Sequence, residues 1–519
     1  MVGFLKKTRS VCPVCIKQVE ADLVQKVDGI YMEKTCSVHG RFSVPVWRDR
    51  LDFRQWSGDL PAVRSGENLL CPDGCSRCTE HQQGSCCVLL EVTSRCNLYC
   101  PVCFARAGSD QEEGSEANAG HDPGIDEMKQ AIDKILEAED KPLIQFTGGE
   151  PTLRDDLPEL ISYARSKGCR YTQLNTNGVR LAEDEAYVRS LAEAGLSFVF
   201  MQFDGVDDKV YKALRGRPLY ETKIAAVRMC DRYSIGVTLV PTLVPGVNDA
   251  QIGEIIRLGA SLSPAVRGIH FQPVAYLGRY RELPNDNGRL TLDELVGEIC
   301  QKANLDAANL LPSRCDHPFC GFHGSYLVRG DTLIPLSHAE SVDSATVTTA
   351  KQNREYIASR WERQDAAEDS AGDQARADET VKESSCAGEG GADSEGADCG
   401  GAGYEGADCE NAVCENAVCE GAGCEGADFE DADCEDADCE DVGCENAGCE
   451  NADCDADEYE TFDGFLDGIR RHGFTITAMV FQDAMNLDIE RLRRCSLHVY
   501  HEGALTPFCA RYLTPMEEK

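Results

Sequence analysis

The sequence predicts an α/β protein whose central part is an open, partial β/α barrel of six strand–helix repeats. Between about residues 89 and 275, short apolar runs typical of strands alternate with amphipathic patterns typical of helices. Most of these strands end in segments rich in Gly, Asn or Asp, and a parallel barrel places its chemistry at the C-terminal ends of its strands. Cysteine-rich segments precede and follow this region, so we expect the barrel to carry additional metal-binding modules.

Each repeat of the barrel can be assigned along the chain. Strands are expected at residues 89–93, 142–146, 171–174, 198–203, 236–240 and 269–273. Helices are expected at residues 125–139, 156–166, 184–194, 222–233 and 250–259. The barrel core is therefore placed within residues 89–300.

A cysteine triplet follows the first strand directly. Cys96, Cys100 and Cys103 have the spacing C-x3-C-x2-C, and an aromatic residue, Phe104, follows the last cysteine. Cluster ligation normally takes four cysteines, so three thiolates would leave one iron of a [4Fe-4S] cube open to an outside ligand. S-adenosylmethionine (SAM) can supply that ligand, and one electron from the cluster then releases a 5′-deoxyadenosyl radical. A zinc knuckle or a four-cysteine cluster is the alternative for the triplet alone.

The later strand ends carry polar motifs that complement this triplet. The second strand ends in Thr147-Gly148-Gly149-Glu150-Pro151. Together with the cysteines, this stretch resembles the radical SAM superfamily. The resemblance implies that Gly148, Gly149 and Glu150 meet the SAM amino group, with Glu150 as its charge partner. It also implies further contacts from later strand ends, to the ribose or carboxylate and to the adenine: Asn175, Asn177, Asp204 and Gln272. Each of these residues alone is also an ordinary turn former.

The N-terminal segment, residues 1–60, has the layout of a metal ribbon. Cys12 and Cys15 form a CPxC knuckle, and Cys36 and His39 follow a strand-like run as CxxH. These residues predict a closed Cys3His zinc site of structural role, with a rubredoxin-like mononuclear iron as the rival. Alternatively, His39 only precedes a turn glycine.

Residues 61–88 hold a second cysteine group with the same spacing as the triplet, Cys71, Cys75 and Cys78. The adjacent Cys86 or Cys87 would complete a four-thiolate set, so we expect an auxiliary [4Fe-4S] cluster here, with zinc as the alternative. A second SAM-cleaving site is disfavoured because no strand and no SAM motif accompany this group.

Segments 301–363 and 461–519 together predict a C-terminal auxiliary-cluster domain. The two segments contain four cysteines, enough to ligate one [4Fe-4S] cube: Cys315, Cys320, Cys495 and Cys509. Disulfides between them are not expected in a reducing cytosol. Zinc, or burial of Cys495 and Cys509 as small apolar residues, is the alternative. The tail motifs are Phe481-Gln482-Asp483, Cys495-Ser496-Leu497-His498 and Pro507-Phe508-Cys509. They resemble the branch that includes tetraether lipid synthases and dihydropterin methylases. The run Cys86–Thr93 resembles a methyltransferase-associated bacterial radical SAM (seleno)protein class more closely.

Residues 364–460 interrupt that domain with a low-complexity, cysteine-containing repeat of period five. From residue 386 to 460 there are 26 acidic residues and no basic ones. A segment with so little apolar bulk and so much charge is expected to be a disordered insert, able to bind metals only adventitiously.

The chain has a net charge of −39, and much of the excess lies in that insert. The rest is mildly acidic, so we expect no nucleic-acid partner. The first ten residues lack an apolar signal core, and no long apolar run predicts a membrane span, so the expected location is cytoplasmic.

The resemblance implies an enzyme that cleaves SAM and functionalises an unactivated carbon, by methylation or C–C bond formation. The implied partners are a ferredoxin or flavodoxin reductant, a small-molecule, lipid or peptide substrate, and a methyltransferase. The alternative is a non-catalytic iron–sulfur electron carrier or scaffold.

Overall fold

The computed structural model describes residues 3–58, 71–75, 81–108, 122–280, 288–313, 315–337, 349–363 and 462–516. The chain divides into two compact units, one of Met1–Glu368 with Glu458–Lys519 and one of Asp369–Asp457. The second unit, and with it the predicted disordered insert, lies outside the described residues, as does Cys78.

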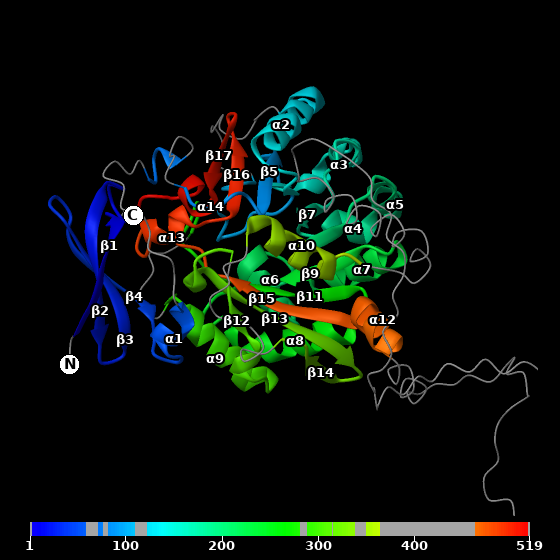
Figure 1. Ribbon diagram of the computed structural model, residues 1–519. Coiled ribbons are helices and arrows are strands. Elements are labelled where there is room, and N and C mark those ends of the chain that lie inside the picture. Colours follow the sequence, from blue (N-terminus) through cyan, green and yellow to red (C-terminus); the bar gives the residue numbers. More distant parts are fainter. Residues whose placement is uncertain are drawn as a thin grey trace, which may run out of the picture. The chain divides into compact units, whose positions relative to one another are not determined.

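The N-terminal ribbon is a four-stranded antiparallel sheet in the order β1-β2-β3-β4 (Figure 1). Its strands are β1 (Gly3–Val11), β2 (Gln18–Lys26), β3 (Gly29–Cys36) and β4 (Gly40–Trp47). The helix α1 (Phe53–Ser57) follows, and its first turn is capped by the Asp52 carboxylate, which accepts from the backbone N–H of Gln55.

The six predicted barrel strands are confirmed, and they lie side by side in chain order. They are β5 (Cys87–Thr93), β6 (Leu143–Gly148), β7 (Thr172–Thr176), β8 (Phe198–Gln202), β9 (Gly236–Val240) and β11 (Val266–Pro273). All five pairings are parallel. Nearly every residue of β6, β8 and β9 is buried, which explains their continuous apolar character, because helices cover the outer face of a parallel sheet.

Several helices of the barrel are amphipathic and pack an apolar face on the sheet. Those between β5 and β11 are α2 (Ile125–Ala138), α3 (Leu157–Ser166), α4 (Val179–Glu183), α5 (Glu185–Glu193), α6 (Asp208–Arg215), α7 (Tyr220–Arg232) and α8 (Ile252–Ser261). The helix α9 (Leu292–Ala303) packs on α8 and begins at a capping box formed by Thr291 and Glu294. Short 3₁₀ turns lie at Pro151–Leu153, Asp249–Gln251, Ala307–Asn309 and Pro318–Cys320.

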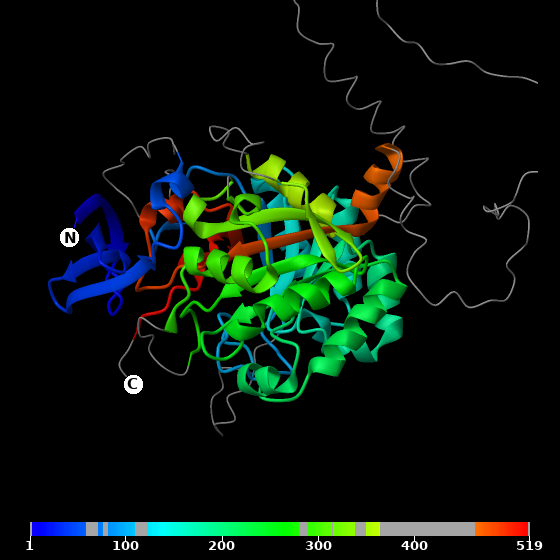
Figure 2. The ribbon, with the colours of Figure 1, turned by 90° about the horizontal axis from the view of Figure 1, so that it is seen from below.

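The C-terminal strands extend the barrel sheet at both edges instead of forming a sheet of their own. Beyond β11 come β15 (Gly473–Met479), β13 (Gly321–Arg329) and β12 (Leu311–Pro312), with β14 (Thr332–Pro335) on β13 (Figure 2). Beyond β5 come β16 (Leu497–His501) and β17 (Ala504–Pro507). The two-residue β10 (Thr242–Leu243) pairs with β11. The remaining helices are α10 (Ala350–Trp361), α12 (Phe462–His472), α13 (Ile489–Arg493) and α14 (Phe508–Arg511).

The ribbon is held to the C-terminal segment by buried polar contacts. Ser10 donates to the carbonyl of Leu487 at 2.5 Å, and Thr8 donates to the Asp488 carboxylate at 2.8 Å. The Lys34 ammonium is buried and donates to the Ala484 carbonyl at 2.9 Å, and this burial lowers its pKa to about 7. Among the described helices, none is both long and apolar enough to cross a membrane.

Candidate functional site

The loop that carries the cysteine triplet leaves the C-terminal end of β5. Its far side is tied to the chain after β11, because Cys103 and Arg279 exchange two backbone hydrogen bonds of 2.9 and 2.8 Å. The Arg279 guanidinium also donates to the Cys100 carbonyl at 3.0 Å. All three cysteines are half-buried, and burial raises the pKa of the Cys96 thiol to about 12.

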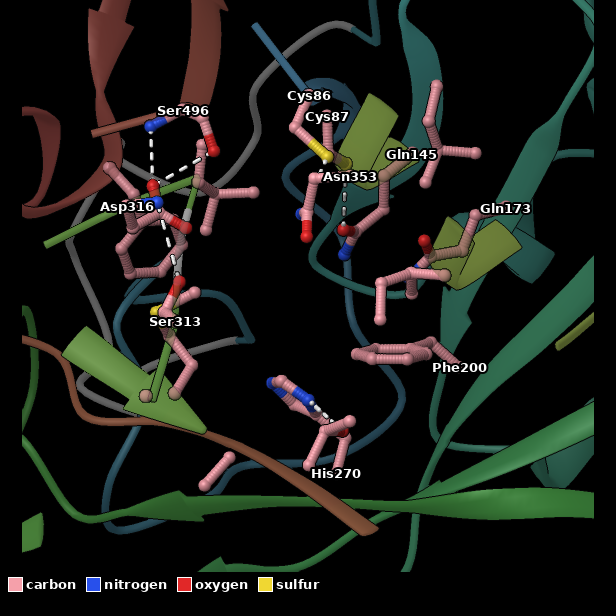
Figure 3. Close-up of a pocket in the computed structure, with 18 of the residues that line it drawn as sticks. Cys86, Cys87, Gln145, Gln173, Phe200, His270, Ser313, Asp316, Asn353 and Ser496 are labelled. Atoms are coloured by element: carbon pink, nitrogen blue, oxygen red, sulfur yellow. Dashed lines mark hydrogen bonds between the residues drawn. The ribbon is translucent and has the colours of Figure 1, made fainter. Parts of the chain in front are cut away.

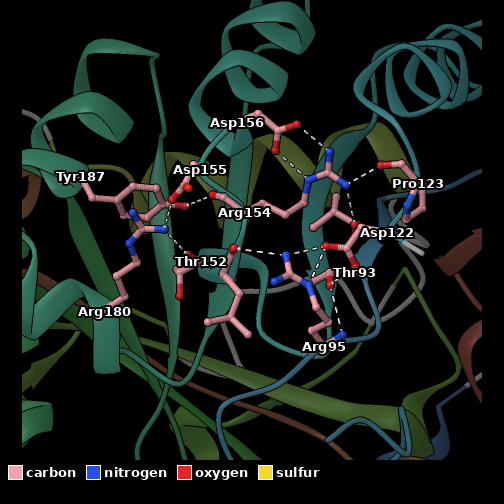
Figure 4. Close-up of polar contacts among 12 residues, drawn as sticks. Thr93, Arg95, Asp122, Pro123, Thr152, Arg154, Asp155, Asp156, Arg180 and Tyr187 are labelled. Carbon is pink, nitrogen blue, oxygen red and sulfur yellow. Dashed lines mark hydrogen bonds and ion pairs between the residues drawn. The ribbon is translucent and has the colours of Figure 1, made fainter. Parts of the chain in front are cut away.

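The near side of the loop is fixed by a polar network between β5 and the turn after β6 (Figure 4). Thr93 and Arg95 both donate to the Asp122 carboxylate, at 2.5 and 2.8 Å. Arg154 is buried and donates both to Asp156 and to the Val92 carbonyl. The end of β5, the first residue of the loop and the turn after β6 are therefore held as one piece.

Gly148 and Gly149 are required where this turn meets the loop that carries the cysteine triplet. Gly149 donates its N–H to the Thr93 carbonyl and Glu150 donates to the Arg95 carbonyl, both at 2.8 Å. A Cβ on Gly149 would lie 2.7 Å from the Arg95 carbonyl carbon and closer still to its oxygen. Gly148 also has a φ of +127°, which other residues avoid. The glycines thus allow two stretches of backbone to touch.

A cavity of about 170 Å³ opens between these loops at the C-terminal ends of the strands. It gathers all three cysteines of the triplet and six of the seven SAM-contact candidates, namely Cys96, Cys100, Cys103, Gly148, Gly149, Glu150, Asn175, Asn177 and Gln272. The structure therefore brings into one space residues that span about 180 positions of the sequence.

Glu150 and Asn177 also organise the walls of this cavity. Glu150 is buried and accepts from Thr152, from the Thr176 hydroxyl at 2.6 Å and from the Asn177 N–H at 2.7 Å. The Asn177 side chain donates to Asn97 of the cysteine-triplet loop at 2.6 Å. These bonds connect the ends of β6 and β7 to the loop, so both side chains hold the site together whatever they bind.

Asp204 is placed behind the cavity, and Arg215 stands between them. Asp204 is fully buried and accepts two hydrogen bonds of 2.7 Å from the Arg215 guanidinium. Arg215 lines the cavity and lies within hydrogen-bonding reach of the Cys100 side chain. Arg215 was not predicted from the sequence as a site residue. Its only local signal is its position on the buried face of α6, beside Tyr211 and Leu214.

A second cavity, of about 160 Å³, adjoins the first inside the barrel (Figure 3). The two share five lining residues: Phe104, Asn175, Gln272, Phe481 and Phe508. The inner cavity is mostly apolar but carries carboxamides from β6, β7 and α10, and His270 from β11. It holds Cys87 as well, whose thiol is 3.6 Å from the Gln145 side-chain oxygen.

A third, small cavity of about 20 Å³ is lined by Cys320, Cys495 and Cys509, together with Asp316. Burial raises the pKa of the Cys509 thiol to about 12. Cys315 is not part of this lining and instead faces the side chain of Cys86. Three of the four cysteines expected in one C-terminal cluster are thus neighbours. Of the earlier group, Cys71 and Cys75 are buried, and Cys78 lies outside the described residues.

The ribbon gathers its four predicted ligands closely. The ligand atoms of Cys12, Cys15, Cys36 and His39 all lie within 4.8 Å of one another. The Cys12 N–H donates to the Lys17 carbonyl at 2.8 Å, which closes the first knuckle. Backbone N–H groups of the second knuckle lower the pKa of Cys36 to about 6, favouring the thiolate that a metal requires. This donor set suits a tetrahedral zinc ion.

Comparison with known proteins identifies two regions. Residues 90–259 match the family model described as Radical SAM superfamily, and residues 4–48 match the HMPTM N-terminal zinc ribbon domain. The 7,8-dihydro-6-hydroxymethylpterin dimethyltransferase of Methanocaldococcus jannaschii is 38% identical over 298 residues, 56% of this chain and 57% of the relative. The Fe-coproporphyrin III synthase of Methanosarcina barkeri is 33% identical over 40% of this chain and 48% of the relative. The chain therefore spans about half the length of these curated relatives.

Solved structures give weaker likenesses. Streptococcus suis SuiB bound to precursor peptide SuiA is 14% identical, with a TM-score of 0.32, covering 38% of this chain and 40% of that one. The structure of anSMEcpe with bound AdoMet is 16% identical, with a TM-score of 0.31, covering 52% of this chain and 84% of that one.

Proposed function

We propose that this chain, whose residues 90–259 match the Radical SAM superfamily model, is an enzyme that reductively cleaves SAM and functionalises an unactivated carbon of a small planar substrate. One observation carries the proposal. The cysteine triplet and the residues at the ends of β6, β7 and β11 line a single cavity.

The residues present fit a [4Fe-4S] cluster and SAM. Cys96, Cys100 and Cys103 would hold the cluster, and when bound the cluster and SAM together supply a 5′-deoxyadenosyl radical. SAM brings a carboxylate and an amino group. Arg215 lines the cavity with a buried guanidinium whose Nε and Nη2 are paired with Asp204, which leaves Nη1 to donate to a carboxylate. The Glu150 oxygen Oε2 accepts only the Asn177 N–H among the described residues, which leaves it capacity for an ammonium.

The inner cavity is our candidate for the substrate site, because it adjoins the first cavity through Asn175 and Gln272. Phe104, Phe481 and Phe508 form the shared apolar wall, with the Phe481 and Phe508 rings stacked at 4.3 Å. Such a wall would exclude water from a reactive intermediate. The matched methyltransferase acts, by its name, on a dihydropterin. We therefore propose methylation of, or C–C bond formation on, a planar heterocycle.

Further metal centres complete the proposal. The ribbon residues Cys12, Cys15, Cys36 and His39 would hold a structural zinc or mononuclear iron. One auxiliary [4Fe-4S] cluster would use Cys320, Cys495 and Cys509, with Cys315 as the fourth ligand expected from the sequence. A second would use Cys71, Cys75 and Cys78, with Cys87 as the candidate fourth ligand. A low-potential carrier such as a ferredoxin or flavodoxin would supply electrons, and a methyltransferase remains a proposed partner.

The test is anaerobic incubation of the iron-reconstituted protein with SAM and dithionite. We expect 5′-deoxyadenosine to form with the wild type and not with Cys96→Ala, and SAM to change the EPR signal of the reduced wild-type cluster only. Equal amounts of 5′-deoxyadenosine from both proteins would exclude an enzyme of this class and favour a scaffold role.

A further inference from the structure

The inner cavity contains a histidine whose hydrogen bonding can be assigned. His270 lies on β11, and its Nδ1 is 2.8 Å from the hydroxyl oxygen of Thr477 on β15. That hydroxyl also lies 3.3 Å from the Ile269 carbonyl oxygen. Thr477 has one proton to donate, so both contacts are hydrogen bonds only if Thr477 donates to Ile269 and accepts from Nδ1–H.

This assignment leaves Nε2 of His270 as a hydrogen-bond acceptor. Burial lowers the pKa of His270 to about 3, so the ring is neutral and has one proton, on Nδ1. Among the described residues, none hydrogen-bonds to Nε2. The ring lies beside Phe200, with centroids 5.1 Å apart, and both side chains line the cavity (Figure 3). Nε2 is not among the described side-chain atoms that are fully buried without a partner, so it is accessible from the cavity that His270 lines, and a ligand that brings an N–H can bond to it there.

Two carboxamides face the same space from the other strands. Gln145 and Gln173 are register partners on β6 and β7, so their side chains lie side by side. Both are buried, at 7% and 2% exposure, and line the cavity. Apart from the long contact of Gln145 with the Cys87 thiol, neither side chain has a hydrogen bond to another described residue. Each offers one donor and one acceptor group to a ligand.

The position of His270 along β11 sets its distance from the first cavity, in which SAM is proposed to bind. His270 and Gln272 are two residues apart on one strand, so they share a face and lie about 7 Å apart. Gln272 lines both cavities, whereas His270 lines only the inner one. A ligand bonded to His270 would therefore lie one residue layer below SAM. A cavity of about 150 Å³ can hold a benzene ring, and this one has about 160 Å³ and shares five lining residues with the first cavity.

We propose that this cavity binds a flat nitrogen heterocycle that donates a ring N–H to Nε2 of His270 and offers amide-type groups to Gln145 and Gln173. The inference rests on the proposed function and deepens it, because it assigns the residues that read the substrate. His270 and the glutamine pair would select for ring N–H and carbonyl groups, while Phe200 and Trp361 offer aromatic faces.

The test measures equilibrium binding of defined probes to the anaerobic, iron-reconstituted protein loaded with SAM. The probes are 7,8-dihydro-6-hydroxymethylpterin, uracil and their singly N-methylated forms. We expect the wild type to bind at least one parent heterocycle, and His270→Phe to weaken that binding about tenfold, the equivalent of one hydrogen bond. Thr477→Val should weaken it by a smaller factor, because it removes the acceptor that holds the proton on Nδ1. His501→Phe, an exposed histidine on β16, is the matched control and should bind as the wild type does.

The N-methylated probes distinguish direct contact from a packing effect. Methylation of the nitrogen that donates to His270 should weaken wild-type binding about tenfold and should cause no further loss in His270→Phe. Iron content and the SAM-dependent EPR signal establish that each variant is folded. Equal binding by wild type and His270→Phe would overturn the proposal. It would also be overturned if N-methylation of the probe weakened binding to both proteins by the same factor. A wild type that cleaves SAM but binds none of the probes would overturn this inference alone and leave the proposed function standing.

Discussion

Replacing Gly149 with alanine should displace the loop that carries the cysteine triplet. The added Cβ would lie 2.7 Å from the Arg95 carbonyl carbon and 2.9 Å from the Ser94 oxygen, closer than real Cβ atoms come. Every obstructing atom belongs to the backbone, so no side-chain rotation relieves the contact. Overpacking of this kind costs about 1–3 kcal/mol of folding free energy. A shift of the loop by roughly 1 Å would lower the rate of SAM cleavage on the order of 100-fold.

The assay compares Gly149→Ala with a matched variant, Gly124→Ala. Gly124 precedes α2 with a φ of −62°, and a Cβ there would meet no atom within 4 Å. For each protein we would measure the free energy of unfolding, the iron content after reconstitution and the rate of 5′-deoxyadenosine formation. Gly124→Ala should match the wild type in all three. If Gly149→Ala bound iron and cleaved SAM at the wild-type rate, the close approach of the two loops would not govern the site.

Three further predictions concern other parts of the chain. Arg215→Gln should raise the KM for SAM at least tenfold, because it removes the buried guanidinium that lines the cavity. Lys209→Gln, on the exposed face of the same helix, is the control and should leave the KM unchanged. Cys36→Ser should abolish stoichiometric metal binding by the ribbon. The full protein would be cleaved with a protease, and the metal bound to the fragment of residues 1–60 would be measured. Formation of 5′-deoxyadenosine by the intact variant reports any effect on the barrel. Retention of the metal would contradict a thiolate ligand at that position. Replacing residues 364–457 with a short Gly/Ser bridge should leave iron loading and SAM cleavage intact, since a segment of that composition cannot offset the entropy of ordering. Loss of iron-loaded protein on this replacement would contradict the prediction.

The confirmed barrel strands share a local origin. Their apolar runs and the turn residues after them are properties of short segments, and six parallel neighbours in chain order follow from simple right-handed connections. The cysteine triplet and the Gly148–Glu150 turn could be predicted from the sequence for the same reason. In each case the chemistry lies within one short stretch next to a strand end. The ribbon ligands were predictable as well, because the spacing within each knuckle limits where they can go.

Contacts between distant segments were not predictable. Segments 301–363 and 461–519 were expected to form a C-terminal auxiliary-cluster domain, but nothing in their sequence indicated that β15 pairs with β11 and β16 with β5. These pairings join strands far apart in the chain at the two edges that the barrel strands leave open. Asp204 ends a strand as expected, but only the packing of α6 shows that Arg215 covers it. That Cys320, Cys495 and Cys509 line one small cavity likewise depends on side chains brought together over more than 150 positions.

The sequence by itself determined the barrel, the position of the cysteine-triplet loop and the ribbon, because each is encoded by short-range periodicity or by cysteine spacing. Only the tertiary structure decided which residues form the inner cavity. Gln145, Gln173 and His270 are unremarkable strand residues in the sequence, and they become a set only when β6, β7 and β11 curve around one space. The physical reason is that a strand's own sequence fixes which side chains share a face, whereas the curvature of the whole sheet fixes which faces meet.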